Sequence, residues 1–297
     1  MEKMSFFDPK VFDQMSADIW NEAAQHYDHL SRLLFRAVTD GFIEFSGIRP
    51  GEKVLDVACG PGAASLRAAA AVGPQGTVDA VDFAEKMLSI ASARTRQAGS
   101  APIVWRRMDA QRLEFPDGSF DAVICQLGLM LFALPKLALG EMARVAKAGG
   151  RVSCLVQGEA DKMLFTSLLN KTMIKHVPEL KIPGAPTIYD FGPPGILENA
   201  LSQAGLARVE SRRLSGKFRF ESPEAYWETM ASGAGRTGVL IQSLEPAKRQ
   251  ALKEDVLAKA AAYMTPTGFD IPYEFVMSRG VKAPTSGGEK ATGAPFA

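Results

Sequence analysis

The chain has 297 residues, of which 46% are hydrophobic, and it carries 34 Lys and Arg against 33 Asp and Glu. This length is enough to bury a complete α/β core with additional structure around it. A net charge close to zero, with no basic block, argues against a nucleic-acid partner and favours a small molecule.

The cysteines and the apolar runs predict a cytoplasmic protein. Cys59, Cys125 and Cys154 all fall in or beside apolar segments and make an odd count, which is typical of buried thiols in a reducing compartment. The longest apolar run, residues 122–134, is interrupted by polar Gln126 and is too short to span a bilayer. We therefore expect no membrane association.

The N-terminal segment, residues 1–45, predicts a helical lid. Trp20, Ala24, Tyr27 and either Leu30 or Ser31 fall on one face of a helix. From about residue 53, apolar runs with strand and helix signals alternate. The strands are expected at 53–58, 76–81, 103–107, 120–126, 151–157, 207–214 and 273–281, and the principal helices at 63–71, 84–98, 135–146 and 194–204.

This alternation predicts an α/β fold with a doubly wound, mostly parallel, seven-stranded sheet. Two helical insertions are expected to interrupt it, and the last strand is expected to be antiparallel. The boundaries that follow are 1–45 for the lid, 46–157 for a nucleoside-cofactor core, 158–193 for a cap insertion, 194–221 for the continued core, 222–268 for a second helical insertion, 269–283 for the last strand and 284–297 for a disordered tail.

A glycine turn carries the strongest chemical signal. The strand Val54-Leu55-Asp56-Val57-Ala58 runs into Cys59-Gly60-Pro61-Gly62, and Asp82 ends the next strand, 20 residues after Gly62. Such a turn lets the backbone approach a nucleoside cofactor, and Asp82 can bind a ribose diol. Asp56 beside the turn, and Ser65 where a pyrophosphate site prefers a third glycine, favour S-adenosylmethionine over a dinucleotide.

Four segments together resemble the class I S-adenosylmethionine-dependent methyltransferases, most closely the ubiquinone/menaquinone C-methyltransferase type and its small-molecule relatives. They are Leu55-Asp56-Val57-Ala58-Cys59-Gly60-Pro61-Gly62, Asp82-Phe83-Ala84-Glu85-Lys86-Met87-Leu88, Met108-Asp109-Ala110 and Ser119-Phe120-Asp121-Ala122-Val123-Ile124-Cys125-Gln126. The resemblance covers residues 18–157 well and implies the Rossmann-like methyltransferase fold.

The resemblance also implies which residues bind S-adenosylmethionine. Ala58, Gly60 and Gly62 would lie along its methionine part, with Ala58 replacing a usual glycine, and Asp56 would face its ammonium. Asp82 would bind the ribose, with Phe83 beside it, while Met87, Asp109 and Ala110 would contact the adenine. Gln126 would lie near the sulfonium, and Tyr27 would close over the cofactor. Each position also has a structural alternative, as a turn, core or solvated residue.

The expected reaction is methyl transfer to a small, aromatic or otherwise apolar acceptor. His26, His29 and Gln126 are the candidate catalytic residues, and with only three histidines we expect no metal site. The two insertions are expected to select the substrate and offer an apolar wall in Met163, Phe165, Met173, Tyr189, Phe191, Tyr226, Trp227 and Met230, although most of these residues are expected to fill the core of the cap itself. The alternatives are a nicotinamide-dependent oxidoreductase on a similar sheet and a non-catalytic methyltransferase-like binding protein. The oligomeric state is not predicted.

Overall fold

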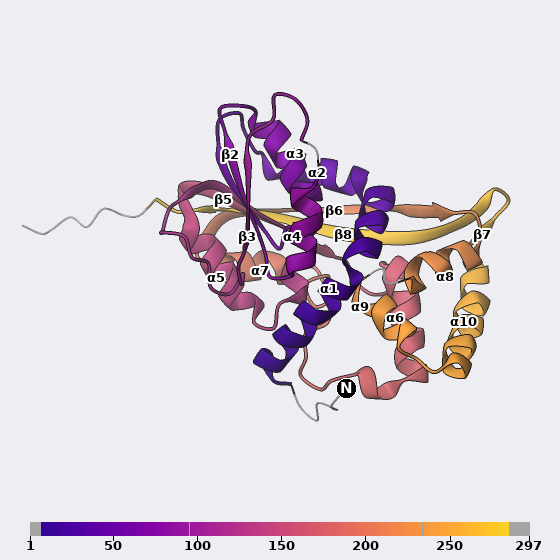
Figure 1. Cartoon of the computed structure of the whole chain (residues 1–297). Coiled ribbons are helices and arrows are strands. Elements are labelled where there is room, and N and C mark those ends of the chain that lie inside the picture. Colours follow the sequence, from indigo (N-terminus) through magenta and orange to yellow (C-terminus); the bar gives the residue numbers. More distant parts are fainter. Residues whose placement is uncertain (1–6, 95, 233–234, 285–297) are drawn as a thin grey trace, which may run out of the picture.

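A single mixed sheet organises the computed structural model, which describes residues 7–94, 96–232 and 235–284. Its strand order is β3-β2-β1-β4-β5-β8-β6, with β7 paired beside β8 (Figure 1). The strands from β3 to β5 are parallel, and β8 is antiparallel to both β5 and β6. The predicted doubly wound α/β fold is confirmed. The sheet has an eighth strand because the two residues of β7 form a short hairpin with the start of β8.

The first half of the chain builds the parallel part of the sheet. Its elements are α1 (Pro9–Leu34), α2 (Arg36–Ser46), β1 (Lys53–Val57), α3 (Ala63–Val72), β2 (Thr77–Asp82), α4 (Glu85–Ser92), β3 (Ile103–Arg107), β4 (Phe120–Gln126), η1 (Leu129–Leu131), α5 (Pro135–Val145) and β5 (Ala146–Gln157). The apolar β1, β2 and β4 are almost entirely buried, as expected of strands covered by helices on both faces.

Two predicted boundaries in this half are wrong. Helix α4 ends at Ser92 rather than at Ala98, where the Ala93 N–H turns back to Ser89 and Ala91. Strand β5 begins at Ala146 rather than at Arg151, and its pairing with β4 shifts across the bulge that contains Gly149 and Gly150. Gly149 has a φ of +76°, which only glycine adopts without strain.

The second half adds a long two-stranded ribbon with a helical layer against it. Its elements are α6 (Leu164–His176), η2 (Pro178–Leu180), α7 (Ile196–Gln203), β6 (Leu206–Phe220), α8 (Pro223–Ala231), α9 (Arg236–Gln242), α10 (Pro246–Ala260), η3 (Ala261–Tyr263), β7 (Met264–Thr265) and β8 (Gly268–Lys282). Figure 1 shows β6 and β8 extending beyond the other strands, with α6, α8 and α10 below them. Both strands are longer than predicted because each pairs with the other along nearly its whole length.

Helix α1 lies across the carboxyl-end side of the sheet and is held there by polar contacts. Asp8 caps its start by accepting the N–H groups of Lys10 and Val11. Asn21 Oδ1 accepts the Lys86 N–H at the start of α4 at 3.0 Å. Asp28 pairs with Arg94, on the segment after α4. These contacts place one face of α1 opposite the loops that follow the strands.

Within the described ranges, none of the helices is long and apolar enough to cross a membrane. The predicted tail lies almost entirely in residues 285–297, which are outside the described residues.

Candidate functional site

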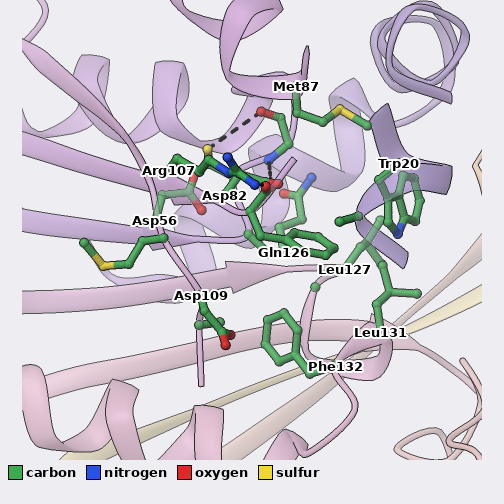
Figure 2. Close-up of a pocket in the computed structure, with 18 of the residues that line it drawn as sticks. Trp20, Asp56, Asp82, Met87, Arg107, Asp109, Gln126, Leu127, Leu131 and Phe132 are labelled. Atoms are coloured by element: carbon green, nitrogen blue, oxygen red, sulfur yellow. Dashed lines mark hydrogen bonds between the residues drawn. The ribbon is translucent and has the colours of Figure 1, made fainter. Parts of the chain in front are cut away.

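A cavity of about 610 Å³ lies between α1 and the carboxyl ends of β1, β2, β3 and β4. Its volume is within the usual range of about 300–1,000 Å³ for small-molecule sites. Figure 2 shows Asp56, Asp82, Asp109 and Gln126 around this cavity, each from the end of a different parallel strand. The structure therefore brings together residues that lie up to 70 positions apart in the sequence, as the predicted switch in strand order requires.

The glycine turn after β1 contributes its backbone to the cavity wall. Gly60 has a φ of +52° and its N–H donates to Asp82 Oδ2 at 2.8 Å. Ala58 has a φ of +56°, an uncommon conformation for a residue with a side chain. Both residues line the cavity.

Gly62 is the last residue of the glycine turn. It does not line the cavity, and a Cβ built on it would lie 2.7 Å from Trp105 Cη2. With a φ of +85°, it allows the turn to pack against β3. The expected contact of Gly62 with the cofactor stays a prediction, and what the structure adds is the packing of Gly62 against Trp105.

Asp82 holds the glycine turn after β1 in place by hydrogen bonds. Its two carboxylate oxygens accept the N–H groups of Gly60 and Ala84, at 2.8 and 2.9 Å. Burial raises the pKa of Asp82 to about 6, although these hydrogen bonds act in the opposite direction. A carboxylate has more than two lone pairs, so Asp82 keeps acceptor capacity toward the cavity.

Asp56 is fully buried, and only one of its two carboxylate oxygens has a hydrogen-bond partner among the described residues. Its Oδ2 accepts the Ser65 hydroxyl at 2.5 Å, and its Oδ1 has no hydrogen-bond partner among the described residues. Burial, and secondarily the charge of Asp82, raises the pKa of Asp56 to about 7. A positively charged group in the cavity would satisfy Oδ1 and favour the ionised form.

The other end of the cavity is lined by apolar side chains and a polar loop. Phe83, Met87 and Ala110 all line it, and Met87 is buried. Asp109, which follows β3 (Figure 2), accepts the Gln111 N–H at 2.8 Å. These residues give the cavity apolar side chains beside acceptor and backbone groups.

Helix α1 covers the cavity with aromatic side chains. The Trp20 and Tyr27 rings are 5.1 Å apart in an edge-to-face arrangement, and both line the cavity. Burial, and secondarily Asp82, raises the pKa of Tyr27 to about 12, so its hydroxyl keeps its proton. In contrast, the candidate bases His26 and His29 are exposed and do not line the cavity.

Gln126 ends β4 and is followed by a second strained residue. Its Nε2 donates to Thr39 Oγ1 of α2 at 2.9 Å, whereas its Oε1 is buried without a partner among the described residues. Leu127 has a φ of +58°, and the chain then approaches the turn after β1 closely at Gly128. Strain of this kind concentrates at ligand sites.

The insertion residues named for a substrate wall belong to the core, as expected for most of them. None of the eight insertion residues named for it lines this cavity, since they pack within the ribbon and its helices. For example, the Tyr226 hydroxyl donates to the Phe165 carbonyl oxygen at 2.8 Å inside that core. Sequence reasoning missed Phe35, just after α1, and four residues of α1 that continuing the helical spacing back from Trp20 finds: Lys10, Asp13, Gln14 and Ala17. Ser31, one of two predicted alternatives, also lines the cavity.

Comparison with known proteins identifies the family of the chain and its cofactor. The family model described as the ubiE/COQ5 methyltransferase family matches residues 9–180, more than half of the chain. The chain belongs to this family. It is an S-adenosylmethionine-dependent methyltransferase, as the glycine turn and Asp82 predicted, and not a nicotinamide-dependent oxidoreductase or a binding protein without activity.

Two relatives illustrate the range of the family. The methyltransferase is 29% identical to nocamycin O-methyltransferase of Saccharothrix syringae, over 88% of this chain and 97% of that protein. It is 32% identical to demethylmenaquinone methyltransferase of Staphylococcus aureus, over 54% of this chain and 68% of that protein.

Solved structures show the same fold at low identity. The YcgJ protein of Bacillus subtilis matches with a TM-score of 0.57 and 19% identity, over 83% of this chain and 99% of that one. Phosphoethanolamine N-methyltransferase 2 of Haemonchus contortus, solved with S-adenosylmethionine, matches with a TM-score of 0.52 and 18% identity, over 83% of this chain and 52% of that one.

Proposed function

We propose that the methyltransferase transfers a methyl group to a small apolar or aromatic acceptor that binds between α1 and the segment after β4. The observation that carries this proposal is the lining of the cavity beyond the turn after β1. There Phe35, between α1 and α2, lines the cavity together with Leu131, Phe132 and the polar Gln126. Apolar walls with one or two fixed polar groups are typical of sites for small organic molecules.

We assign the cofactor residues by the order of the strands. Asp109 and Ala110, with Met87 and Phe83, would hold the adenine at the ends of β2 and β3. Asp82 would accept the ribose hydroxyls, and the Ala58–Gly60 backbone would lie along the methionine part. Asp56 would accept the ammonium, which the unpartnered Oδ1 supports. Tyr27 would cover the ribose, because its ring lies 4.0 Å from a Cβ built on Gly60.

Bound S-adenosylmethionine supplies an activated methyl group, so the chain's own residues mainly bind, orient and exclude water. Trp20 and Tyr27 close the cavity on the α1 side. Tyr27 stays neutral and can donate a hydrogen bond, because burial raises its pKa to about 12. The exposed positions of His26 and His29 do not support a role for either as a base, because neither lines the cavity.

Turnover with isotopically methyl-labelled cofactor and a panel of demethylated aromatic and quinol acceptors tests the reaction. Phe132→Ala should raise the KM of an accepted substrate several-fold while leaving S-adenosylhomocysteine affinity within about twofold. Trp227→Ala is the matched control, since Trp227 is buried in the cap and does not line the cavity. Equal effects of both substitutions on KM would refute the acceptor position.

We also propose a cytoplasmic location. The three free and buried cysteines support it, because thiols in this state are usual in reducing compartments.

A further inference from the structure

Three buried side-chain oxygens have no hydrogen-bond partner in the part of the chain that the structure describes, and two of them belong to cavity residues. These two are Asp56 Oδ1 and Gln126 Oε1. In the parallel pair β1 and β4, Asp56 lies opposite Ile124. Gln126 is two residues beyond Ile124, so Asp56 and Gln126 project from the same face of the sheet.

Buried acceptors without a donor are unfavourable, so a neighbouring pair of them calls for a ligand with more than one donor. An ammonium group has three N–H donors and a positive charge, which matches one carboxylate and one amide oxygen.

Thr39 holds one end of the Gln126 amide. The Thr39 side chain is on α2, outside the cavity lining, and is only 3% exposed. Its Oγ1 accepts the Gln126 Nε2 hydrogen bond at 2.9 Å, and Oε1 has no partner among the described residues. Without this acceptor the amide could turn and direct N–H groups at a cationic ligand, and this would replace an attraction by a repulsion.

We propose that Thr39 is a positioning residue for cofactor binding: it orients Gln126 so that Gln126 Oε1 and Asp56 Oδ1 together accept the ammonium of S-adenosylmethionine. The inference rests on the proposed cofactor site and adds to it a residue that does not touch the cofactor.

Binding of two ligands by calorimetry tests this role. S-adenosylhomocysteine carries the ammonium, and 5′-methylthioadenosine has the same adenosine without it. Thr39→Val removes the hydroxyl with little change of shape. We expect it to weaken the binding of S-adenosylhomocysteine about tenfold, as for loss of one charge-assisted hydrogen bond. The affinity for 5′-methylthioadenosine should stay within about twofold. Thr39→Ser keeps the hydroxyl and should retain both affinities.

Gln126→Met completes a double-mutant cycle. It should weaken S-adenosylhomocysteine to a similar degree, and Thr39→Val should then have no further effect. If Thr39→Val does not fold, Thr39→Ala takes its place in the cycle with the same two ligands. Unchanged S-adenosylhomocysteine affinity, or an equal loss for both ligands, overturns the positioning role. Failure of the unmodified protein to bind either ligand would instead overturn the proposed cofactor site itself.

Discussion

The contact between Ala58 and Gly128 makes a sharp test of how the two strained loops fit together. The methyl group of Ala58 would lie 2.5 Å from a Cβ built on Gly128, and Cys125 Sγ would lie 3.0 Å from it. Gly128 itself has an ordinary φ of −94°. Gly128→Ala should therefore destabilise the protein by a collision with Ala58 and not by backbone strain.

The size of the effect follows from overpacking. A methyl group forced into a packed site costs about 1–3 kcal/mol. Ala58→Gly removes the opposing methyl group. It also relieves the strain of a positive φ, which should stabilise the fold by about 1–2 kcal/mol. Glycine loses more conformational entropy on folding, which should cost about 0.5–1 kcal/mol. The double variant should thus recover most of the stability that Gly128→Ala loses. The part not recovered comes from the close approach of Cys125 Sγ. The expected coupling free energy is about 1–2 kcal/mol.

Thermal unfolding of the four proteins measures this coupling. Gly128→Ala should lower Tm by roughly 2–12 °C, given about 1–3 kcal/mol and about 2–4 °C per kcal/mol for domains approaching this size, and Ala58→Gly in the same chain should restore it. The stabilising shift produced by S-adenosylhomocysteine should return with it, since both residues line the cavity. Additive effects of the two substitutions would refute the contact as the cause.

Three other predictions concern the cofactor site. Asp82→Ala should weaken S-adenosylhomocysteine binding about 10- to 100-fold, measured by calorimetry, and Asp82→Asn less, because the amide keeps one acceptor; unchanged affinity would exclude Asp82 as the ribose ligand. Gly62→Val should lower Tm strongly even without ligand, because its Cβ would strike Trp105 at a φ of +85°; a normal melt would contradict the packing described. The raised pKa values of Asp56, to about 7, and Asp82, to about 6, mean that the empty folded protein holds protons that the unfolded chain releases, so its stability should fall as pH rises from about 4 to about 7. Affinity for S-adenosylhomocysteine, which carries an ammonium group, should rise over the upper part of this range, and Asp56→Asn should flatten that rise; a pH-independent affinity would argue against ionisation of Asp56 on binding.

The cofactor half of the fold could be predicted because its signals are local. A buried strand, a glycine turn and a helix follow one another within a few residues, and Asp82 lies one β–α–β unit later. The hydrogen bond from the Gly60 N–H to Asp82 joins the two parts of that unit. Short-range backbone requirements of this kind can be read from residue types and spacing alone.

The remaining features depended on contacts between distant segments. Gly62 packs against Trp105, which belongs to another strand. Gln126 donates a hydrogen bond to Thr39, 87 residues away in the sequence. The insertions contain enough aromatic residues to form a substrate wall or a core, and periodicity does not distinguish these outcomes. The pairing of β6 with β8 directs Phe165 and Tyr226 into the main core, because an amphipathic ribbon must bury its apolar face. That burial leaves the lining of the cavity to α1, the strand ends and the loops that follow them.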